Sequence, residues 1–400
     1  MEFQKTNLGE LSVNGKGSYG IAASAVPYSD ELFTYLRITD INDDGTLNKS
    51  GLMSVSDEKA EQYLLKPNDI VFARTGGSTG RSYFYDGTDG EFVYAGFLIK
   101  FSIDSTKVNP RFIKYYCLSQ EYRGWVHSFN TGSTRGNINA QTYANMPILL
   151  PSREQQDLLV DTLSVIDEKI KLNTAINENL EQQAQALFKA WFVDFEPFGG
   201  AMPDDWTETT LGTIAAISTK SINPLKQPDL YLEHYSIPAY DEQHYPVFEY
   251  ASEVKSNKYI LTNNSVMISK LNPDTKRIWR PLCLSANPVC STEFIVYESV
   301  NPKYKDYIYS LIDSQSFSDY LCAHTTGSTN SRQRATPKTT LDFPCVLPTD
   351  DTMSQFCGVV TPIYNQIGAN LIENQRLAFL RDTLLPKLMN GEIDVSEVKI

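Results

Sequence analysis

The sequence predicts an α+β protein in which two tandem globular domains with mostly antiparallel or mixed sheets are joined by two long helices that form an antiparallel coiled coil. Two observations carry this prediction. Apolar residues alternate at steps of four and three along residues 159–191, and the same spacing recurs 197 residues later, along residues 356–388. Short matches outside these stretches repeat at nearly the same distance, which indicates an internal duplication with pseudo-two-fold symmetry.

This spacing predicts a helix that packs along another helix, and each stretch would span roughly 50 Å at 1.5 Å per residue. The first series is Leu159, Leu163, Ile166, Ile170, Asn173, Asn177, Leu180, Ala184, Leu187 and Trp191. The second series is Phe356, Val360, Ile363, Ile367, Asn370, Asn374, Leu377, Arg381, Leu384 and Leu388. Apart from the two asparagines, only Arg381 breaks the apolar pattern of the second series.

Two asparagines occupy the centre of each series, Asn173 and Asn177 in the first and Asn370 and Asn374 in the second. In an antiparallel pair the two centres meet and the four amides can bond to one another, which fixes the register. A buried amide without a partner would cost about 1–3 kcal/mol. A parallel pair in the same register would also bring the amides together, but the symmetry favours the antiparallel pair. Two unrelated core helices are the alternative, and they have no reason to repeat a polar layer.

The rest of the chain repeats in the same order, which predicts globular domains at 1–150 and 198–347 and spacer helices within 151–197 and 348–400. The apolar segment Asp69–Arg74 corresponds to Asn264–Lys270, and each segment ends on a cation. Further matches are Val108–Pro110 with Val300–Pro302, Thr131–Thr134 with Thr326–Thr329, and Pro147 and Pro151 with Pro344 and Pro348. Proline and glycine within residues 196–200 should end the first helix.

Composition limits the possible functions. A net charge of −13 argues against a general nucleic-acid coat. Six cysteines without a CxxC pair and four scattered histidines predict no zinc site, so the cysteines are expected to be reduced core residues of a cytoplasmic protein. No apolar run approaches the ~18 residues of a membrane span, and the first residues have no signal-peptide pattern, so no membrane partner is expected.

Positive charge collects at matched places in the two domains. Arg74–Arg81 has two cations and no acid, and Lys270–Arg280 has four cations against Asp274. Arginine beside small polar residues can contact phosphates and base edges. A solvated turn is the alternative for each segment alone, but their matched positions favour nucleic-acid binding. The candidate contacts are Arg74, Thr75, Ser78, Arg81, Thr131, Ser133, Thr134 and Arg135 in the first domain, and Lys270, Asn272, Lys276, Arg277, Arg280, Ser328, Thr329, Arg332 and Arg334 in the second.

The sequence contains no recognisable catalytic motif. Residues 14–18 lack the spacing of a phosphate-binding loop, and residues 75–80 lack its lysine. Neither GxSxG, HExxH nor a recognisable Cys/His pairing occurs. Residues 271–274 do not match the catalytic loop of amino methyltransferases, and residues 203–205 lack the downstream partner of a nuclease motif. The chain is therefore expected to bind without performing chemistry, and to hold neither a cofactor nor a metal.

The order of domain, long helix, domain and long helix resembles the specificity (S) subunit of type I restriction-modification systems, across essentially the whole chain. The residues that carry the resemblance are Gly132–Thr134, Pro151–Gln155, Leu187–Pro197 and Leu384–Gly391. Each motif is weak alone, but this order, occurring twice, is specific. Pro348–Met353 departs from the pattern, because it replaces the Glu-Gln helix start found after Pro151. Partner contacts at the second helix are therefore not expected to repeat those at the first.

The resemblance implies that each domain reads one half of a split, asymmetric site in double-stranded DNA. The helices would be a spacer and a docking surface for two methyltransferase subunits, which bring S-adenosylmethionine and methylate adenine. Restriction subunits, with ATP and Mg²⁺, would join the assembly. A 50 Å coil corresponds to roughly 15 base pairs. The predicted docking residues are Trp191, Phe192, Phe195, Leu384 and Leu388, on two apolar segments at the ends of the helices.

Two other functions fit the sequence. The chain could be the DNA-reading subunit of a bipartite type II system, which differs in its partners, or a coiled-coil adaptor whose domains bind proteins. Salt-dependent, sequence-selective DNA binding separates the adaptor from both DNA-reading functions. The enzyme subunit that co-purifies separates the two restriction systems from each other.

Overall fold

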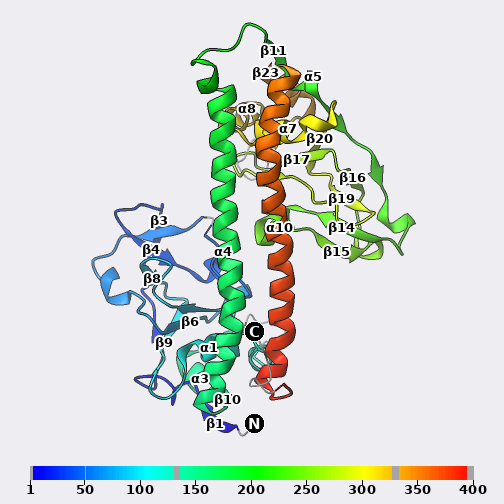
Figure 1. Ribbon diagram of the computed structural model, residues 1–400. Helices are drawn as coiled ribbons and strands as arrows, with labels where there is room; N and C mark the ends of the chain where they lie inside the picture. Colours follow the sequence, from blue (N-terminus) through cyan, green and yellow to red (C-terminus); the bar gives the residue numbers. More distant parts are fainter. Residues whose placement is uncertain (1–2, 50, 130–135, 327–332, 394–400) are drawn as a thin grey trace. The chain divides into compact units, whose positions relative to one another are not determined.

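The computed structural model describes residues 3–49, 51–129, 136–326 and 333–393 (Figure 1). Its contacts divide the chain into two compact units, which we call unit 1 (Met1–Lys169 with Arg376–Ile400) and unit 2 (Ile170–Gln375). Each unit holds one globular part and a portion of both long helices. This grouping differs from the four ranges predicted from the sequence, because the helix portions pack onto the globular cores.

The two long helices are α4 (Arg153–Phe192) and α10 (Asp350–Met389), each 40 residues long (Figure 1). At 1.5 Å per residue each is about 60 Å long. In unit 2, Asn173 of α4 bonds to Asn374 of α10, and Asn177 bonds to Asn370. Because the α10 partner falls in number as the α4 residue rises, the pair is antiparallel, as predicted.

A left-handed turn follows the end of α4. Phe195 has φ 54° and Gly199 has φ 79°. The backbone N–H of Gly200 donates to the carbonyl oxygen of Phe195 at 3.0 Å. These conformations cannot continue a helix, and glycine adopts them without strain. Helix α4 thus ends at Phe192, shortly before the stop that the sequence predicted within residues 196–200.

The described residues of unit 1 form three sheets. Its strands are β1 (Gln4–Asn7), β2 (Ser18–Tyr19), β3 (Ala25–Val26), β4 (Phe33–Leu36), β5 (Met53–Val55), β6 (Asp69–Ala73), β7 (Ser82–Tyr85), β8 (Phe92–Tyr94), β9 (Leu98–Ser102) and β10 (Pro147–Leu150). Its helices, apart from the long pair, are η1 (Ile38–Asp40), η2 (Ala60–Tyr63), η3 (Gly76–Ser78), α1 (Pro110–Tyr116), α2 (Gln120–His127) and α3 (Ala140–Ala144). The strand orders are β1-β10, β2-β9-β6-β7 and β3-β5-β4-β8.

Unit 2 has the strands β11 (Thr207–Thr210), β12 (Ala215–Ser218), β13 (Ser221–Ile222), β14 (Tyr231–Tyr235), β15 (Val247–Tyr250), β16 (Lys258–Ile260), β17 (Ser265–Ser269), β18 (Ile278–Trp279), β19 (Pro288–Ser291), β20 (Phe294–Ser299), β21 (Thr325–Thr326), β22 (Arg334–Ala335) and β23 (Pro344–Leu347). Its helices are η4 (Glu196–Phe198), α5 (Leu211–Ile214), η5 (Pro224–Lys226), α6 (Ile237–Gln243), η6 (Ala251–Glu253), η7 (Pro302–Tyr304), α7 (Lys305–Asp313), α8 (Gln315–Ala323) and α9 (Pro337–Thr340). The larger sheets have the orders β12-β20-β17-β18 and β13-β16-β19-β14-β15.

The two units repeat one topology. The sheet β12-β20-β17-β18 corresponds to β2-β9-β6-β7, and the pair β11-β23 corresponds to β1-β10. In the remaining sheet, β14 lies between antiparallel β15 and parallel β19, as β4 lies between β5 and β8. The units differ at the edges of this sheet, where unit 1 adds β3 and unit 2 adds β16 and β13. The predicted internal repeat with mixed sheets is thus confirmed.

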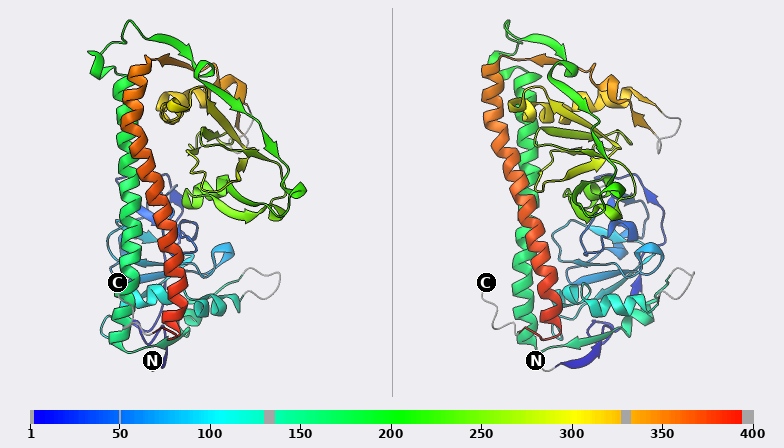
Figure 2. Two further views of the ribbon diagram at one scale, coloured as in Figure 1. Left: turned by 45° about the vertical axis from the view of Figure 1, so that its right-hand side comes forward. Right: turned by 90° about the vertical axis from the view of Figure 1, so that its right-hand side faces the viewer.

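Heptad residues of the two long helices belong to the hydrophobic cores of both units. In unit 1, Leu163 of α4 and Leu388 of α10 pack in the same buried cluster as Phe72 of β6. In unit 2, Phe188 of α4 and Phe356 of α10 share a cluster with the residues of α7. Helix α7 also packs against β17 and β20, which places it beside the four-stranded sheet (Figure 2). Burial against the sheet-bearing cores therefore accounts for the apolar pattern.

The central asparagines form the predicted polar layer in unit 2. Asn173 Nδ2 donates to Asn374 Oδ1 at 2.9 Å, and Asn370 Nδ2 donates to Asn177 Oδ1 at 2.8 Å. Asn173 Nδ2 also bonds to a carboxylate oxygen of Glu373 at 2.7 Å. Asn173, Asn177 and Asn370 are buried, so these bonds replace water. The amides therefore meet across the helix pair as the antiparallel arrangement requires.

Replacing Asn173 and Asn177 together by leucine should change the register of the helix pair. The amides of Asn370 and Asn374 would then face apolar side chains, and each unpaired amide would cost about 1–3 kcal/mol. A shift in register would remove this cost, because it would return the amides to water. We expect loss of a unique solution shape by small-angle X-ray scattering, with little loss of stability. Exposed Asn179 of the same helix provides the control, Asn179→Leu. An unchanged shape and an unchanged spacing of the DNA target would contradict the role of the layer.

Two expectations from composition can be compared with the structure. All six cysteines are free, but only Cys117, Cys290 and Cys357 are buried, so the expectation of six core cysteines was wrong. Cys322 is exposed because it lies on the outer side of the short helix α8. None of the helices that the structure describes combines the length and apolarity needed to cross a bilayer.

Candidate nucleic-acid interface

Arg74 lies at the carboxyl end of β6, the strand paired with both β7 and β9 in its sheet. Its backbone N–H donates to the carbonyl oxygen of Phe97 at 3.1 Å, and its carbonyl oxygen accepts from Ile138 N–H at 2.9 Å. The neighbouring residue, Thr75, forms an isolated antiparallel bridge with Asn137. The backbone at Arg74 is thus held from two sides.

Lys270 occupies the same position in unit 2, directly after β17. Its N–H donates to the carbonyl oxygen of Glu293 at 2.8 Å, and its carbonyl oxygen accepts from Ala335 N–H at 2.9 Å. The next residue, Leu271, forms an isolated bridge with Arg334, as Thr75 does with Asn137. The predicted match between the segments that end at Arg74 and Lys270 is therefore confirmed at the level of single hydrogen bonds.

Arg81 and Arg277 are a second matched pair of cations. The carbonyl oxygen of Arg81 accepts a hydrogen bond from Ala73 N–H at 2.8 Å, and the carbonyl oxygen of Arg277 accepts one from Ser269 N–H at 2.9 Å. Both side chains are already bound to acids, Arg81 Nε to Asp43 Oδ1 and Arg277 Nε to Asp241 Oδ1, each at 2.6 Å.

The ion pair of Arg277 is bidentate, since Nη2 also donates to Asp241 Oδ2 at 2.9 Å, and its side chain is only 14% exposed. Arg280 is held in the same manner, with Nε 2.7 Å from Asp306 Oδ1 and a further bond to Asn365. Burial opposes ionisation of Asp306, but Arg280 and Thr361 outweigh it and lower the pKa of that carboxyl. Aspartates of unit 2 therefore partner both Arg277 and Arg280 in this structure, and their assignment as DNA contacts stays a prediction.

Other predicted cations are neutralised in part. Lys276 Nζ lies 2.5 Å from Asp313 Oδ1, and Arg334 Nη2 lies 3.3 Å from Glu293 Oε2. By contrast, neither Arg74 nor Lys270 forms an ion pair with any residue that the structure describes. The two cations at the matched strand ends therefore keep their charge available to a ligand.

Each available cation lies over a tyrosine ring. Arg74 Cζ is 5.1 Å from the ring centroid of Tyr19, and Lys270 Nζ is 5.9 Å from that of Tyr259. Both distances are within the range of a cation–π contact. Burial lowers the pKa of Lys270, Glu293 opposes this, and nearby Arg334 reinforces it.

The polar residues after the two cations line short turns. Thr75 and Ser78 are half-buried beside Gly76, which has φ +79°. Asn272 also has positive φ, +48°, and its side-chain oxygen is buried with no partner among the described residues. These turns can approach a ligand closely. The remaining candidates, Thr131, Ser133, Thr134, Arg135, Ser328, Thr329 and Arg332, lie outside the described residues.

Several residues of these sites were not predicted from the sequence, among them Asp43, Asp241, Tyr19 and Tyr259. One signal could have revealed the acids, because Asp43 precedes Arg81 by 38 positions and Asp241 precedes Arg277 by 36. For the tyrosines there was no such signal, since they lie on strands that do not correspond.

The predicted docking residues lie in the cores. Phe192 and Leu388 are buried in units 2 and 1 respectively, and Trp191, Phe195 and Leu384 are partly buried against the same clusters. Phe192, for example, contacts Trp206 and Phe356 with ring centroids 5.7 and 4.8 Å apart. Phe192 and Leu388 are therefore core residues, and their assignment to partner docking is corrected.

Exposed apolar side chains occur elsewhere on the long helices. Helix α4 exposes an apolar stripe, spaced by seven and four residues: Leu158, Val165, Leu172 and Ile176. Leu172 is 56% exposed, and on α10 Phe379 is 75% exposed. Exposed apolar residues in a repeating pattern are typical of a surface that meets another helix.

A family model described as the type I restriction modification DNA specificity domain matches residues 6–182, and related proteins match further along the chain. Residues 6–182 therefore match this domain family, and the chain as a whole is similar to the specificity subunits of type I restriction-modification systems. It is 25% identical to the type I restriction enzyme HindI specificity subunit of Haemophilus influenzae, over 82% of this chain and 87% of that protein. It is also 25% identical to the MjaIX specificity subunit of Methanocaldococcus jannaschii, over 73% of this chain and 71% of that protein.

The fold agrees with this similarity. The S subunit of a type I system from M. genitalium has a similar structure, with a TM-score of 0.55 and 15% identity over 97% of this chain and 96% of that one. These similarities support a DNA target-recognition subunit of a type I system.

Proposed function

We propose that units 1 and 2 each read one half of a split, asymmetric DNA target, with Arg74 and Lys270 as the central cationic contacts. The observation that carries this proposal is the repeated position of the two cations. Both follow the corresponding strand, both have the same backbone bonds, and neither is neutralised by an acid among the described residues.

The chemistry of the two cations supports an asymmetric target. An arginine guanidinium can donate two parallel hydrogen bonds to O6 and N7 of guanine, whereas the lysine ammonium is a compact charge with rotatable donors. The turns also differ, with Thr75 and Ser78 near Arg74, but Asn272 near Lys270. The same scaffold would therefore present different donors to each half of the target.

The partners in this proposal are two methyltransferase subunits, with restriction subunits joining the assembly. S-Adenosylmethionine, ATP and Mg²⁺ would be bound by those partners, and adenine would be the methylated base. Support for docking on α4 comes from its exposed apolar stripe, bordered by the exposed acids Glu154, Asp161 and Glu168. A basic, apolar helix of a methyltransferase would fit this face.

Leu172→Glu should weaken the binding of methyltransferase to the chain. It places a charge in the middle of the exposed stripe, where a partner would bury an apolar side chain worth about 1.5–3 kcal/mol. Co-purification followed by light scattering would measure the number of bound partners. Gln182→Glu is the matched control, because Gln182 is exposed on the same helix outside the stripe. Equal recovery of partners with both variants would exclude the stripe as the docking face.

The proposed function is tested by mapping methylated adenines in cells with and without this chain. We expect one motif to depend on the chain, with two specified half-sites separated by a constant number of unread base pairs. Co-purification of separate methyltransferase and restriction subunits with the chain would support a type I system. Co-purification of a single enzyme that both methylates and cleaves DNA would indicate a bipartite type II system. A chain whose removal changes no methylation motif, and which binds no DNA with its partners, would be an adaptor.

A further inference from the structure

We propose that Tyr19 is a positioning residue, whose ring holds the guanidinium of Arg74 in the orientation that contacts the first half-site. The first half-site is the part of the DNA target read by unit 1, so this inference rests on the proposed function. Tyr19 would act through Arg74 and would not itself need to touch DNA.

The ring of Tyr19 is fixed at both ends. Its backbone lies in β2, which pairs with β9 through Ser18 and Tyr19. Its hydroxyl oxygen accepts a hydrogen bond from the N–H of Ala140, the first residue of α3, at 3.1 Å. The face of this anchored ring lies 5.1 Å from Arg74 Cζ, although 42% of Tyr19 is exposed.

Arg74 depends on this ring because little else holds its side chain. Among the described residues it has no ion pair, and its Nε is buried without a hydrogen-bond partner. An arginine with several rotatable bonds loses conformational freedom on binding, and a ring that already orients it reduces that loss. Arg81, by comparison, is oriented by Asp43 but is also neutralised by it. An aromatic ring orients a cation and leaves its hydrogen-bond donors free.

Unit 2 contains the same combination built from a different strand. Lys270 lies over Tyr259 of β16, in the five-stranded sheet of unit 2, whereas Tyr19 belongs to β2, in the sheet β2-β9-β6-β7 of unit 1. The cations correspond in the repeat and the tyrosines do not. The support of a matched cation by an unmatched ring indicates that the pairing is a property of the site and not a remnant of the duplication.

The inference is tested by a double-mutant cycle on the full chain in complex with its partners, using competition binding to the mapped target. Tyr19→Leu should weaken binding about two- to fivefold, the range of an exposed cation–π contact. On DNA with an altered first half-site, and in the Arg74→Ala background, Tyr19→Leu should have no further effect. Tyr19→Phe keeps the ring and should restore most of the affinity.

A matched control is Tyr28→Leu, which removes another exposed ring from unit 1 and should leave both half-sites unaffected. An equal loss from Tyr19→Leu with and without Arg74 would overturn the inference, and so would a loss that also affects the second half-site. If Arg74→Ala itself left the first half-site unaffected, the proposed reading site would fail, and the positioning role with it. Failure of the proposed reading site can be told apart from failure of the positioning role, because it already appears in the Arg74→Ala single variant.

Discussion

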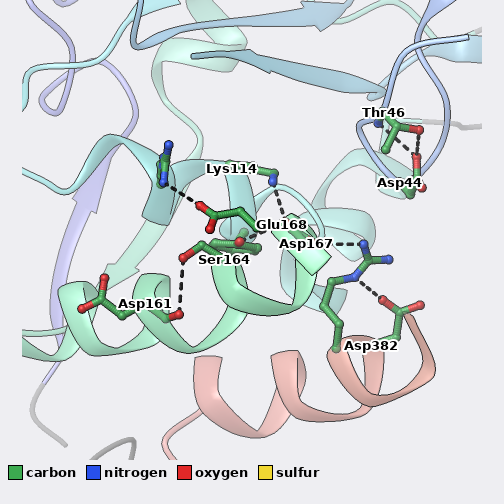
Figure 3. A network of polar contacts seen from close by, with 11 residues as sticks. Asp44, Thr46, Lys114, Asp161, Ser164, Asp167, Glu168 and Asp382 are labelled. Carbon is green, nitrogen blue, oxygen red and sulfur yellow. Dashed lines mark hydrogen bonds and ion pairs between the residues drawn. The ribbon is translucent and has the colours of Figure 1, made fainter. Parts of the chain in front are cut away.

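Arg381→Leu is expected to lower the free energy of unfolding of unit 1 by about 3 kcal/mol, because it breaks a buried ion network. The Arg381 side chain is 11% exposed, with Nη1 3.2 Å from Asp167 Oδ1 and Nε 3.0 Å from Asp382 Oδ1 (Figure 3). Asp167 also accepts from Lys114 Nζ at 2.6 Å and from the Tyr115 hydroxyl at 2.9 Å. Without Arg381, the partly buried carboxylate retains Lys114 but loses its second cation.

Hydrogen exchange of peptides from unit 1 would measure this loss separately from unit 2, since two units need not unfold together. The control is Arg376→Leu, the same chemical change at an exposed arginine of the same helix. Equal exchange rates in the two variants would show that the network does not stabilise unit 1.

The effect of Arg381→Leu should also depend on pH. Burial alone would raise the pKa of Asp167, but Lys114 and Arg381 outweigh burial and lower it. Ionised Asp167 therefore stabilises the folded state fully above its unfolded pKa of about 3.9, and this contribution is lost as pH falls through the lower folded pKa. The difference between the Arg381 variant and its control should accordingly be larger at neutral pH than in acid.

Arg74→Ala should weaken binding through the first half-site by about 1–3 kcal/mol, or roughly 5- to 150-fold, because a bidentate arginine–guanine contact is lost. Lys270→Ala should act in the same manner on the second half-site. Competition with DNA altered in one half-site at a time would separate the two. If Arg74 contacts only a phosphate, all sequences should weaken alike and the salt slope should fall by about one.

The control for Arg74→Ala is Arg111→Ala, which removes another cation from unit 1, 3.9 Å from Glu168. It should leave half-site discrimination unchanged. If Arg74→Ala and Lys270→Ala were sensitive to the same half-site, or neither changed binding, the assignment of one reader to each unit would have to be abandoned.

The sequence predicted the helices and the repeat well because both are periodic. The amide bonds of Asn173 with Asn374 and of Asn177 with Asn370 follow from spacing alone. The match of Arg74 with Lys270 was also visible, since the strands before them repeat. The order of domains and long helices could therefore be predicted from the apolar spacing and from the constant distance between repeated segments.

The sequence did not distinguish available cations from neutralised ones. The acids that bind Arg81 and Arg277 lie on segments where the two halves otherwise have little in common, so their similar distance from the two arginines was the one available signal. The wrong docking assignment of Phe192 has another cause. Its apolar neighbours, such as Trp206 and Tyr307, come from distant segments, so a buried helix end could not be told from an exposed one.

The composition of the two units has a consequence for synthesis on the ribosome. Unit 2 is one continuous segment, but the core of unit 1 includes Leu385, Leu388 and Met389 from the far end of α10. At 5–20 residues per second, unit 1 waits roughly 10–40 s after residue 169 emerges before these side chains arrive. During that interval unit 2 can complete its core while the N-terminal segment still exposes the apolar surface they will cover. Premature termination within α10 would consequently damage the first part of the chain to be made.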